Sequence, residues 1–292
     1  MSIATDFETF CKNIKMDERT VETISTRYQS ITRRLNLDFW GLDSTISHSF
    51  YTGSYGRDTE IYTSDIDMVM VLPPSLYDRY AYSAGNGKSA LLQAVKRSIE
   101  KTYPNTDVGG NGQVVQVMFS DRMMFEIVPA FEQSNGTYKY PDSNNGGSWR
   151  IMDPKSEMAA FTAMNNRCNK NLKRLCRMAR AWNAYNRVGM KGILIDTLAY
   201  KFIKDYEYND KSYTYYDWMS RDFMQFLYDN HDQAYWYVPG SNWQISRNTY
   251  FKNDARIGRD KCCEAIKYAK DNMPYSEHSK WREHYGTKYP NA

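Results

Sequence analysis

The sequence has 292 residues, of which 41% are hydrophobic, and 38 basic against 34 acidic side chains give a net charge of +4. This length fits one large domain or two small ones and the hydrophobic content supplies a core, which excludes a mini-protein and wholesale disorder. The mild charge does not by itself indicate nucleic acid or a membrane, no apolar run approaches about 20 residues, and the polar start excludes a signal peptide.

The first predicted element is a helix over 6–38, because apolar residues recur there close to a 3.6-residue period. Residues 50–64 are rich in Gly, Ser, Thr and Tyr, which predicts a turn or loop. The run 65–72 (DIDMVMVL) predicts a strand that is stopped by Pro73 and Pro74.

The middle of the chain predicts a helix over 88–102, followed by strands over 113–119 and 122–128 that a tight turn joins. The polar stretch 134–148 predicts a mobile loop. Beyond it the pattern is helical, over 158–187, 192–206, 216–230 and 256–272. The layout is therefore a helix, a small mixed α/β region and a mostly helical half.

The cysteines and histidines give no sign of a metal centre. There are five Cys and four His, the His are scattered, and no C-x-x-C pair occurs. An odd number of cysteines without such pairs predicts reduced thiols in the cytoplasm rather than a disulfide framework or a zinc site.

The sharpest chemical signal is a set of carboxylates. Asp65 and Asp67 alternate on one strand, so they point to the same face, and two like charges there require a cation. Glu126 is a charge within an otherwise apolar strand and predicts the third ligand. Mg²⁺ prefers such oxygens together with substrate phosphates. Gly53 and Ser54 form a turn before Asp65 that suits a phosphate. Each feature alone is more often a surface or loop residue; the combination is specific.

A second signal is a basic helix. Residues 166–191 carry eight Lys or Arg and no acid. The cationic positions lie about 200° around the helix from an apolar stripe. A stripe of one sign destabilises a helix unless an anion offsets it, which predicts a phosphate-binding wall. A nucleic-acid-facing or simply basic surface is the alternative. The basic residues are Arg167, Lys170, Lys173, Arg174, Arg177, Arg180, Arg187 and Lys191.

Four stretches of the sequence resemble the DNA-polymerase-β-like nucleotidyltransferases, and more narrowly the bacterial cyclic-oligonucleotide synthases of the CD-NTase family, relatives of cyclic GMP-AMP synthase. The resemblance spans roughly residues 1–270. The stretches are FYTGSYGRDT (50–59), SDIDMVMVLP (64–73), FEIVPA (125–130) and LKRLCRMARAWN (172–183), the last followed by GILIDTL (192–198).

The resemblance implies an α+β, two-lobed fold. A mixed-sheet catalytic lobe within 1–155 is joined by a long N-terminal spine helix to a helical C-terminal lobe, 156–292, that closes the active-site cleft. It implies two Mg²⁺ or Mn²⁺ ions on Asp65, Asp67 and Glu126. It also implies NTP phosphates bound by Gly53, Ser54, Lys173, Arg180 and Lys191.

The sequence departs from the family pattern at three positions. Arg180 stands where related enzymes have Lys, Gly192 stands where a Ser is frequent, and Glu126 stands where the third acid is usually Asp. Asn165 and Asn166 fall where related enzymes place a base-reading side chain; an N-cap or loop role is the alternative that the sequence favours.

The function that the resemblance implies is synthesis of a cyclic di- or trinucleotide second messenger from NTPs, with release of pyrophosphate, in anti-phage (CBASS) signalling. Neither a membrane nor nucleic acid is required, and a regulatory protein from the same defence system is an expected partner. The alternative enzyme is a terminal or toxin-type nucleotidyltransferase that acts on RNA or protein. A nucleic-acid sensor with a dead catalytic site is a third reading, which the intact acids oppose.

Overall fold

The computed structural model describes residues 2–62 and 65–292, and the chain divides by its internal contacts into two compact units. The sheet unit comprises Asp17–Arg57 and Thr63–Lys155. The helical unit comprises Met1–Met16, Asp58–Tyr62 and Ser156–Ala292. Ser64, the first residue of the second motif, lies outside the described residues.

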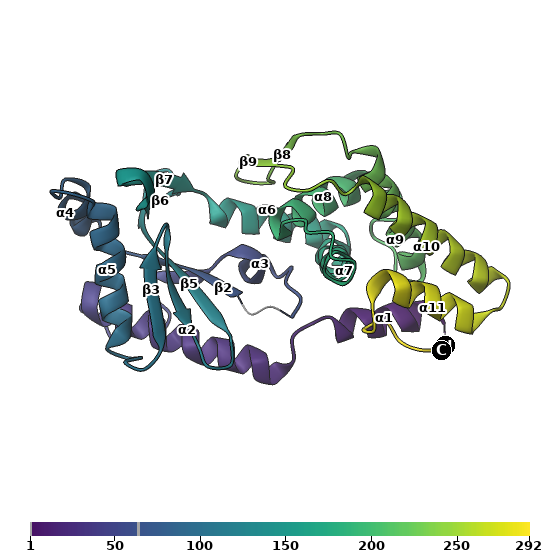
Figure 1. The fold of residues 1–292 in the computed structure, drawn as a ribbon, viewed down its shortest axis with the longest axis horizontal. Coiled ribbons are helices and arrows are strands. Elements are labelled where there is room, and N and C mark those ends of the chain that lie inside the picture. The colour runs from purple at the N-terminus through teal and green to yellow at the C-terminus, as the bar shows by residue number, and fades with distance from the viewer. Residues whose placement is uncertain (1, 63–64) are drawn as a thin grey trace. The chain divides into compact units, whose positions relative to one another are not determined.

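The sheet unit combines helices with β-strands. Its elements in chain order are α2 (Glu18–Phe39), β1 (Ser49–Tyr51), α3 (Gly53–Arg57), β2 (Asp65–Val71), η1 (Pro74–Leu76), α4 (Tyr77–Ala81), α5 (Gly87–Glu100), β3 (Asp107–Asn111), β4 (Val114–Met118), β5 (Met124–Glu132), β6 (Tyr138–Asp142), η2 (Asn144–Gly146) and β7 (Ser148–Met152). The α+β class predicted from the sequence is confirmed (Figure 1).

The strands form a mixed seven-stranded sheet within the described residues. Its main path is β1-β2-β5-β4-β3, with β6 paired to β5 and β7 paired to β6. The β2–β5 pair is parallel and the others are antiparallel. Alternate residues of β2, namely Ile66, Met68 and Met70, are fully buried, and α2 and α5 contact the sheet and each other. This alternation leaves the first residues of the opposite face, Asp65 and Asp67, at least partly exposed.

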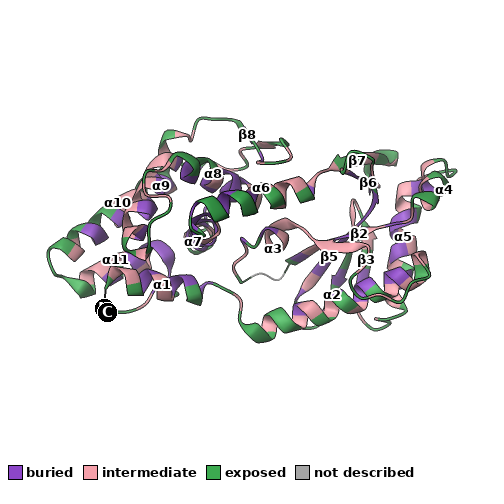
Figure 2. Ribbon diagram, turned by 180° about the vertical axis from the view of Figure 1, so that it is seen from behind, coloured by how far each residue is buried: buried purple, intermediate pink, exposed green. Residues whose placement is uncertain are grey.

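The helical unit contains the N-terminal helix and the C-terminal half of the chain. Its elements are α1 (Ile3–Asn13), α6 (Pro154–Arg167), α7 (Asn171–Tyr185), α8 (Gly192–Asp205), η3 (Tyr213–Tyr215), α9 (Tyr216–Asp229), β8 (Tyr235–Tyr237), β9 (Gln244–Ser246), α10 (Lys252–Lys270) and α11 (Pro274–Tyr285). The helices share one core that includes Phe7, Trp182, Phe223 and Trp281, each at most 1% exposed. As expected for helices around a core, α2 and α10 bury one side and expose the other (Figure 2).

Two helices that the periodicity predicts as continuous are interrupted. The predicted helix 6–38 is two helices, because the Asp17 side chain accepts a hydrogen bond from the Thr20 N–H (2.8 Å) and so begins α2. The predicted helix 158–187 divides at Asn169 and Lys170, which both have positive φ. The buried Asn165 lies within α6 and accepts a hydrogen bond from the Lys173 N–H (3.0 Å) in the first turn of α7. It is therefore neither a loop residue nor the N-cap of α7, which is Lys170.

Other differences concern short elements. The predicted loop 50–64 contains part of β1 and all of α3, and the predicted loop 134–148 contains β6 and η2. The sequence reading also missed β3, α4 and α11. No helix in the described part of the chain is both long and apolar enough to span a bilayer.

Candidate functional site

The predicted carboxylates come together through the register of the central strands. The parallel pairing of β2 with β5 sets Asp67 directly opposite Glu126, and Asp65 opposite Met124. Adjacent strands lie about 4.8 Å apart, so Asp67 and Glu126 are nearest neighbours on one face of the sheet. Asp65 lies two residues before Asp67 and shares that face. The sheet therefore gathers the three acids that the sequence predicted as catalytic.

Burial and neighbouring charges of both signs determine the electrostatics of this face. Burial, together with the negative charges of Glu126 and Asp65, raises the pKa of Asp67 to about 6. Arg57, which is 6% exposed, acts in the opposite direction and lowers this pKa. Gln116 of β4 donates a hydrogen bond to Glu126 Oε1 (2.7 Å) and holds that carboxylate on the sheet.

Gly53 lies against the Asp67 carboxylate. It begins α3 with φ +62°, and a Cβ atom at this position would be 1.9 Å from Asp67 Oδ2. The Asp67 C=O accepts the Thr52 N–H (2.9 Å), which ties the start of the turn to β2. Only glycine combines this backbone conformation with such a close approach. The Gly-Ser turn that the sequence singled out therefore lies beside the acids.

The residue types and the strand pairing at this site both suit a divalent cation. Three carboxylates on one sheet face supply the hard oxygen ligands that Mg²⁺ prefers, and the negative charges of Glu126 and Asp65 beside Asp67 favour a cation there. In the described part of the chain no three His, Cys, Asp or Glu side chains already converge as a metal-holding group. The metal role of Asp65, Asp67 and Glu126 accordingly stays a prediction.

The basic helix differs from the predicted open cationic face. Arg177 is 5% exposed, and its guanidinium forms an ion pair with Asp58. Arg180 forms a two-point ion pair with the fully buried Asp196, Nε to Oδ1 at 3.0 Å and Nη2 to Oδ2 at 2.7 Å. Lys173 Nζ lies 3.4 Å from Asp58 Oδ2. The anions that offset these cations are side chains outside α7: Asp58, far away in the sequence, and Asp196 of the next helix.

This pairing corrects the expectation that the stripe of α7 requires an external anion. The sequence pattern could not show it, because Asp58 lies more than a hundred residues from 166–191 and Asp196, although only 16 residues after Arg180, is on the next helix. One signal was available: Asp196 is a lone charge within the apolar run GILIDTL, the same kind of signal that identified Glu126. The contribution of Lys173, Arg180 and the exposed Lys191 to phosphate binding stays a prediction.

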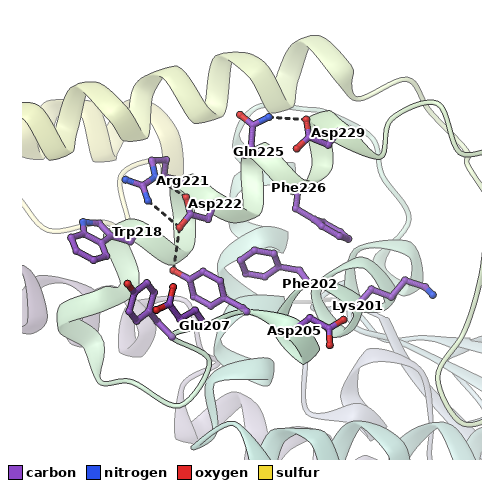
Figure 3. A pocket seen from close by; sticks show the side chains of 12 residues that line it. Lys201, Phe202, Asp205, Glu207, Trp218, Arg221, Asp222, Gln225, Phe226 and Asp229 are labelled. Atoms are coloured by element: carbon purple, nitrogen blue, oxygen red, sulfur yellow. Dashed lines mark hydrogen bonds and ion pairs between the residues drawn. The ribbon is translucent and has the colours of Figure 1, made fainter.

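A cavity of about 700 Å³ in the helical unit contains none of the predicted site residues. It lies between α8 and α9 and is lined by several aromatic side chains, among them Phe202, Tyr206 and Trp218 (Figure 3). Its polar groups largely satisfy one another: Arg221 pairs with Asp222 at 2.7 Å, and Tyr206 Oη donates to Asp222 at 3.3 Å. The cavity is therefore not part of the candidate site.

Comparisons with known proteins agree with the fold described above. Residues 1–165 match the family model of the Second Messenger Oligonucleotide or Dinucleotide Synthetase domain. The structure of E. coli MS115-1 CdnC with ATP has a TM-score of 0.70 and 14% identity, and the match covers 99% of each chain. The CdnC:HORMA-deltaN complex gives a TM-score of 0.71 at 14% identity, covering 99% of this chain and 98% of that one.

A further match is more distant in sequence. E. coli DncV with bound 3'-deoxy GTP has a TM-score of 0.68 and 11% identity, and the match covers 95% of this chain and 93% of that one. At these identities the likeness is one of fold. No curated protein sequence is a significant match to the chain.

Proposed function

Because the chain belongs to the family of second messenger oligonucleotide or dinucleotide synthetases and is a nucleotidyltransferase, we propose that it makes a cyclic di- or trinucleotide from NTPs and releases pyrophosphate. The observation that carries the proposal is the register of β2 and β5, which places Asp67 opposite Glu126 and beside Gly53. Asp65 completes the acidic face.

In the proposed reaction a ribose hydroxyl of one nucleotide attacks the α-phosphate of another. The O–P bond forms as the bond to pyrophosphate breaks, and the hydroxyl proton passes to solvent; a second such step closes a dinucleotide ring, and a trinucleotide ring needs a third. Asp65, Asp67 and Glu126 would hold two Mg²⁺ ions, with Mn²⁺ as a substitute. Bound divalent cations lower the pKa of the attacking hydroxyl and offset the charge of the leaving pyrophosphate.

The remaining steps belong to the chain's own residues. The turn at Gly53 and Ser54, where backbone can approach a phosphate closely, would bind the triphosphate next to Asp67. Gln116 keeps the Glu126 carboxylate turned to the same face. Arg57, buried near Asp67, supplies a fixed positive charge that favours the ionised form of that carboxylate. Lys173, Arg180 and Lys191 stay candidate phosphate contacts.

The biological setting is also a proposal. We place the protein in the cytoplasm, where NTPs are available, and in anti-phage (CBASS) signalling with a regulatory protein partner. The solved complex of CdnC with HORMA-deltaN supports such a partner for a protein of this fold.

The direct test is incubation of the purified protein with labelled NTPs and Mg²⁺, followed by phosphatase treatment and mass spectrometry. A phosphatase-resistant product that Asp67→Asn abolishes would support the proposal. A linear polymer, or label transferred to an added RNA or protein, would instead identify the terminal or toxin-type transferase. If the protein turned over no NTP mixture, the proposed reaction would be contradicted.

A further inference from the structure

A five-residue segment joins the two halves of the candidate site. Asp58–Tyr62 belongs to the helical unit, although the chain on both sides of it belongs to the sheet unit. It leaves α3, which begins at Gly53 and contains Ser54, and it leads towards β2, which carries Asp65 and Asp67. Ile61 packs against the core of the helical unit. The segment is therefore anchored in the helical unit immediately after α3, the helix that contains Gly53 and Ser54.

The first end of the segment is held by Arg177 of α7. Asp58 has positive φ and follows the last residue of α3. Its carboxylate pairs with the Arg177 guanidinium, and Lys173 Nζ lies 3.4 Å from it. The Nε–H of Arg177 donates to the Glu60 C=O (3.0 Å). One buried guanidinium thus binds both a side chain and the backbone of the segment, which a Lys ammonium could not match in geometry.

The middle of the segment is held through Asp196 of α8. Thr59 is fully buried and donates its hydroxyl to Asp196 Oδ2 (2.7 Å). The same carboxylate receives both donors of Arg180 described above. Asp196 is itself 0% exposed, so this is a closed network of charge-assisted hydrogen bonds rather than a solvated ion pair.

The lack of a side chain at Gly192 leaves room for the Arg180 guanidinium. A Cβ at Gly192 would lie 2.3 Å from Arg180 Nη1 and 2.7 Å from Nη2. A side chain at position 192 would push the guanidinium off Asp196. The glycine that stands here in place of a serine therefore matches the arginine that stands in place of a lysine: the two departures from the family pattern fit each other sterically.

We propose that Thr59, Arg177, Arg180 and Asp196 are positioning residues of the nucleotidyltransferase reaction: they hold the segment Asp58–Ile61, which follows directly after α3 and its Gly53–Ser54 turn. In this role Arg180 acts through Asp196 and Thr59, which replaces the phosphate contact that the resemblance implies for it. The inference rests on the proposed function and deepens it, because it assigns Arg180 a task in the reaction other than binding phosphate.

The two roles of Arg180 predict opposite results for Asp196→Asn. If Arg180 bound phosphates, loss of the Asp196 charge would release it and strengthen binding of a non-cleavable analogue of the NTP that the wild type consumes. If Arg180 positions the segment, the analogue should bind within about twofold of wild type while kcat falls at least tenfold, since a misplacement of about 1 Å at a reacting centre can cost hundredfold.

Thr59→Val provides a second test that keeps the ion pair. It removes one buried hydroxyl at nearly constant volume. The matched control is Ser220→Ala in the same unit: Ser220 is 1% exposed, donates to the Tyr216 C=O (2.6 Å) and accepts from Tyr285 Oη (2.7 Å). Each substitution removes a buried hydrogen-bonding hydroxyl, but Ser220 does not contact the segment.

The measurements are kcat and KM for the NTP, together with thermal unfolding. We expect Thr59→Val to lower kcat at least tenfold with KM within twofold, Thr59→Ser to restore it, and Ser220→Ala to keep wild-type kcat despite a similar fall in Tm. The proposal is overturned if Thr59→Val keeps wild-type kcat, if kcat follows Tm equally in both variants, or if Asp196→Asn tightens analogue binding. An inactive wild type would instead refute the proposed function.

Discussion

Replacing Gly53 by alanine should disable the acidic face while the fold survives. In the structure a Cβ at this position would lie 1.9 Å from Asp67 Oδ2 and 2.7 Å from its Cγ. Atoms in ordinary contact lie about 3.4 Å apart, so the Asp67 carboxylate would have to retreat by about 1.5 Å or the turn would have to open. Either change alters the distance between the Gly53–Ser54 turn and the carboxylates.

The size of the effect follows from these distances. A displacement of more than 1 Å at a reacting centre costs about hundredfold in rate, so Gly53→Ala should lower kcat by about that factor or more. The positive φ of +62° strains the folded backbone of an alanine, which lowers the free energy of unfolding by about 1–2 kcal/mol. The assay is initial-rate pyrophosphate release at saturating NTP and Mg²⁺, with urea unfolding measured on the same samples.

Gly41→Ala is the matched control in the same unit. Gly41 has φ +64°, and nothing lies within 4 Å of a Cβ built there, so this variant carries the backbone strain without the contact. It should lose about 1–2 kcal/mol of stability and keep wild-type kcat. The reasoning is refuted if Gly53→Ala keeps a third or more of the activity, or if Gly41→Ala loses as much.

Three further predictions concern metal binding, pH and the buried ion pair. Mg²⁺ at a hundredfold excess over its Kd should stabilise the wild type by about 2.7 kcal/mol in thermal unfolding, and Asp67→Asn should abolish that gain; an equal gain in both would place the ion elsewhere. Burial lowers the pKa of His284 to about 3. Below about pH 6.5 the unfolded chain therefore takes up a proton that the folded protein does not, and this should remove about 2 kcal/mol of stability between pH 7 and pH 5. His284→Leu should flatten that part of the urea-unfolding profile, and an unchanged slope would contradict it. Arg180→Met removes the guanidinium that pairs with the buried Asp196 charge and should cost about 3–5 kcal/mol, whereas adding Asp196→Leu should recover most of it; a double variant no more stable than the single one would rule out the pairing.

The acidic face could be predicted from the sequence because its signals are local. Asp65 and Asp67 alternate on one strand, and a charge such as Glu126 inside an apolar strand is visible without a fold. The register that sets Asp67 opposite Glu126 was beyond reach, since it depends on the parallel pairing of strands separated by more than fifty residues. Arg57 and Gln116 were missed for the same reason.

Two further features could not be predicted from the sequence: the interruptions of the helices and the partners of the basic side chains. Periodicity detects a buried stripe but neither a single capping side chain such as Asp17 nor the positive φ of Asn169 and Lys170, and these divide the two predicted helices. The ion-pair partners of the α7 cations could not be predicted, because Asp58 and Asp196 become their neighbours only in the folded chain. The division of the chain at 155 and 156 and the phosphate contacts remain predictions.

The path of the backbone has a consequence for how the protein can be taken apart. The chain passes between its two units at Met16–Asp17, Arg57–Asp58, Tyr62–Thr63 and Lys155–Ser156. A fragment that ends near residue 155 would carry Asp58 and Thr59 without Arg177 and Asp196, and so would bring a charge and a hydroxyl into solution that the whole chain buries or pairs. Neither unit can therefore be separated from the other by cutting the chain at two positions. In a chimera of related enzymes, the segment Asp58–Tyr62 should be exchanged together with α7 and α8.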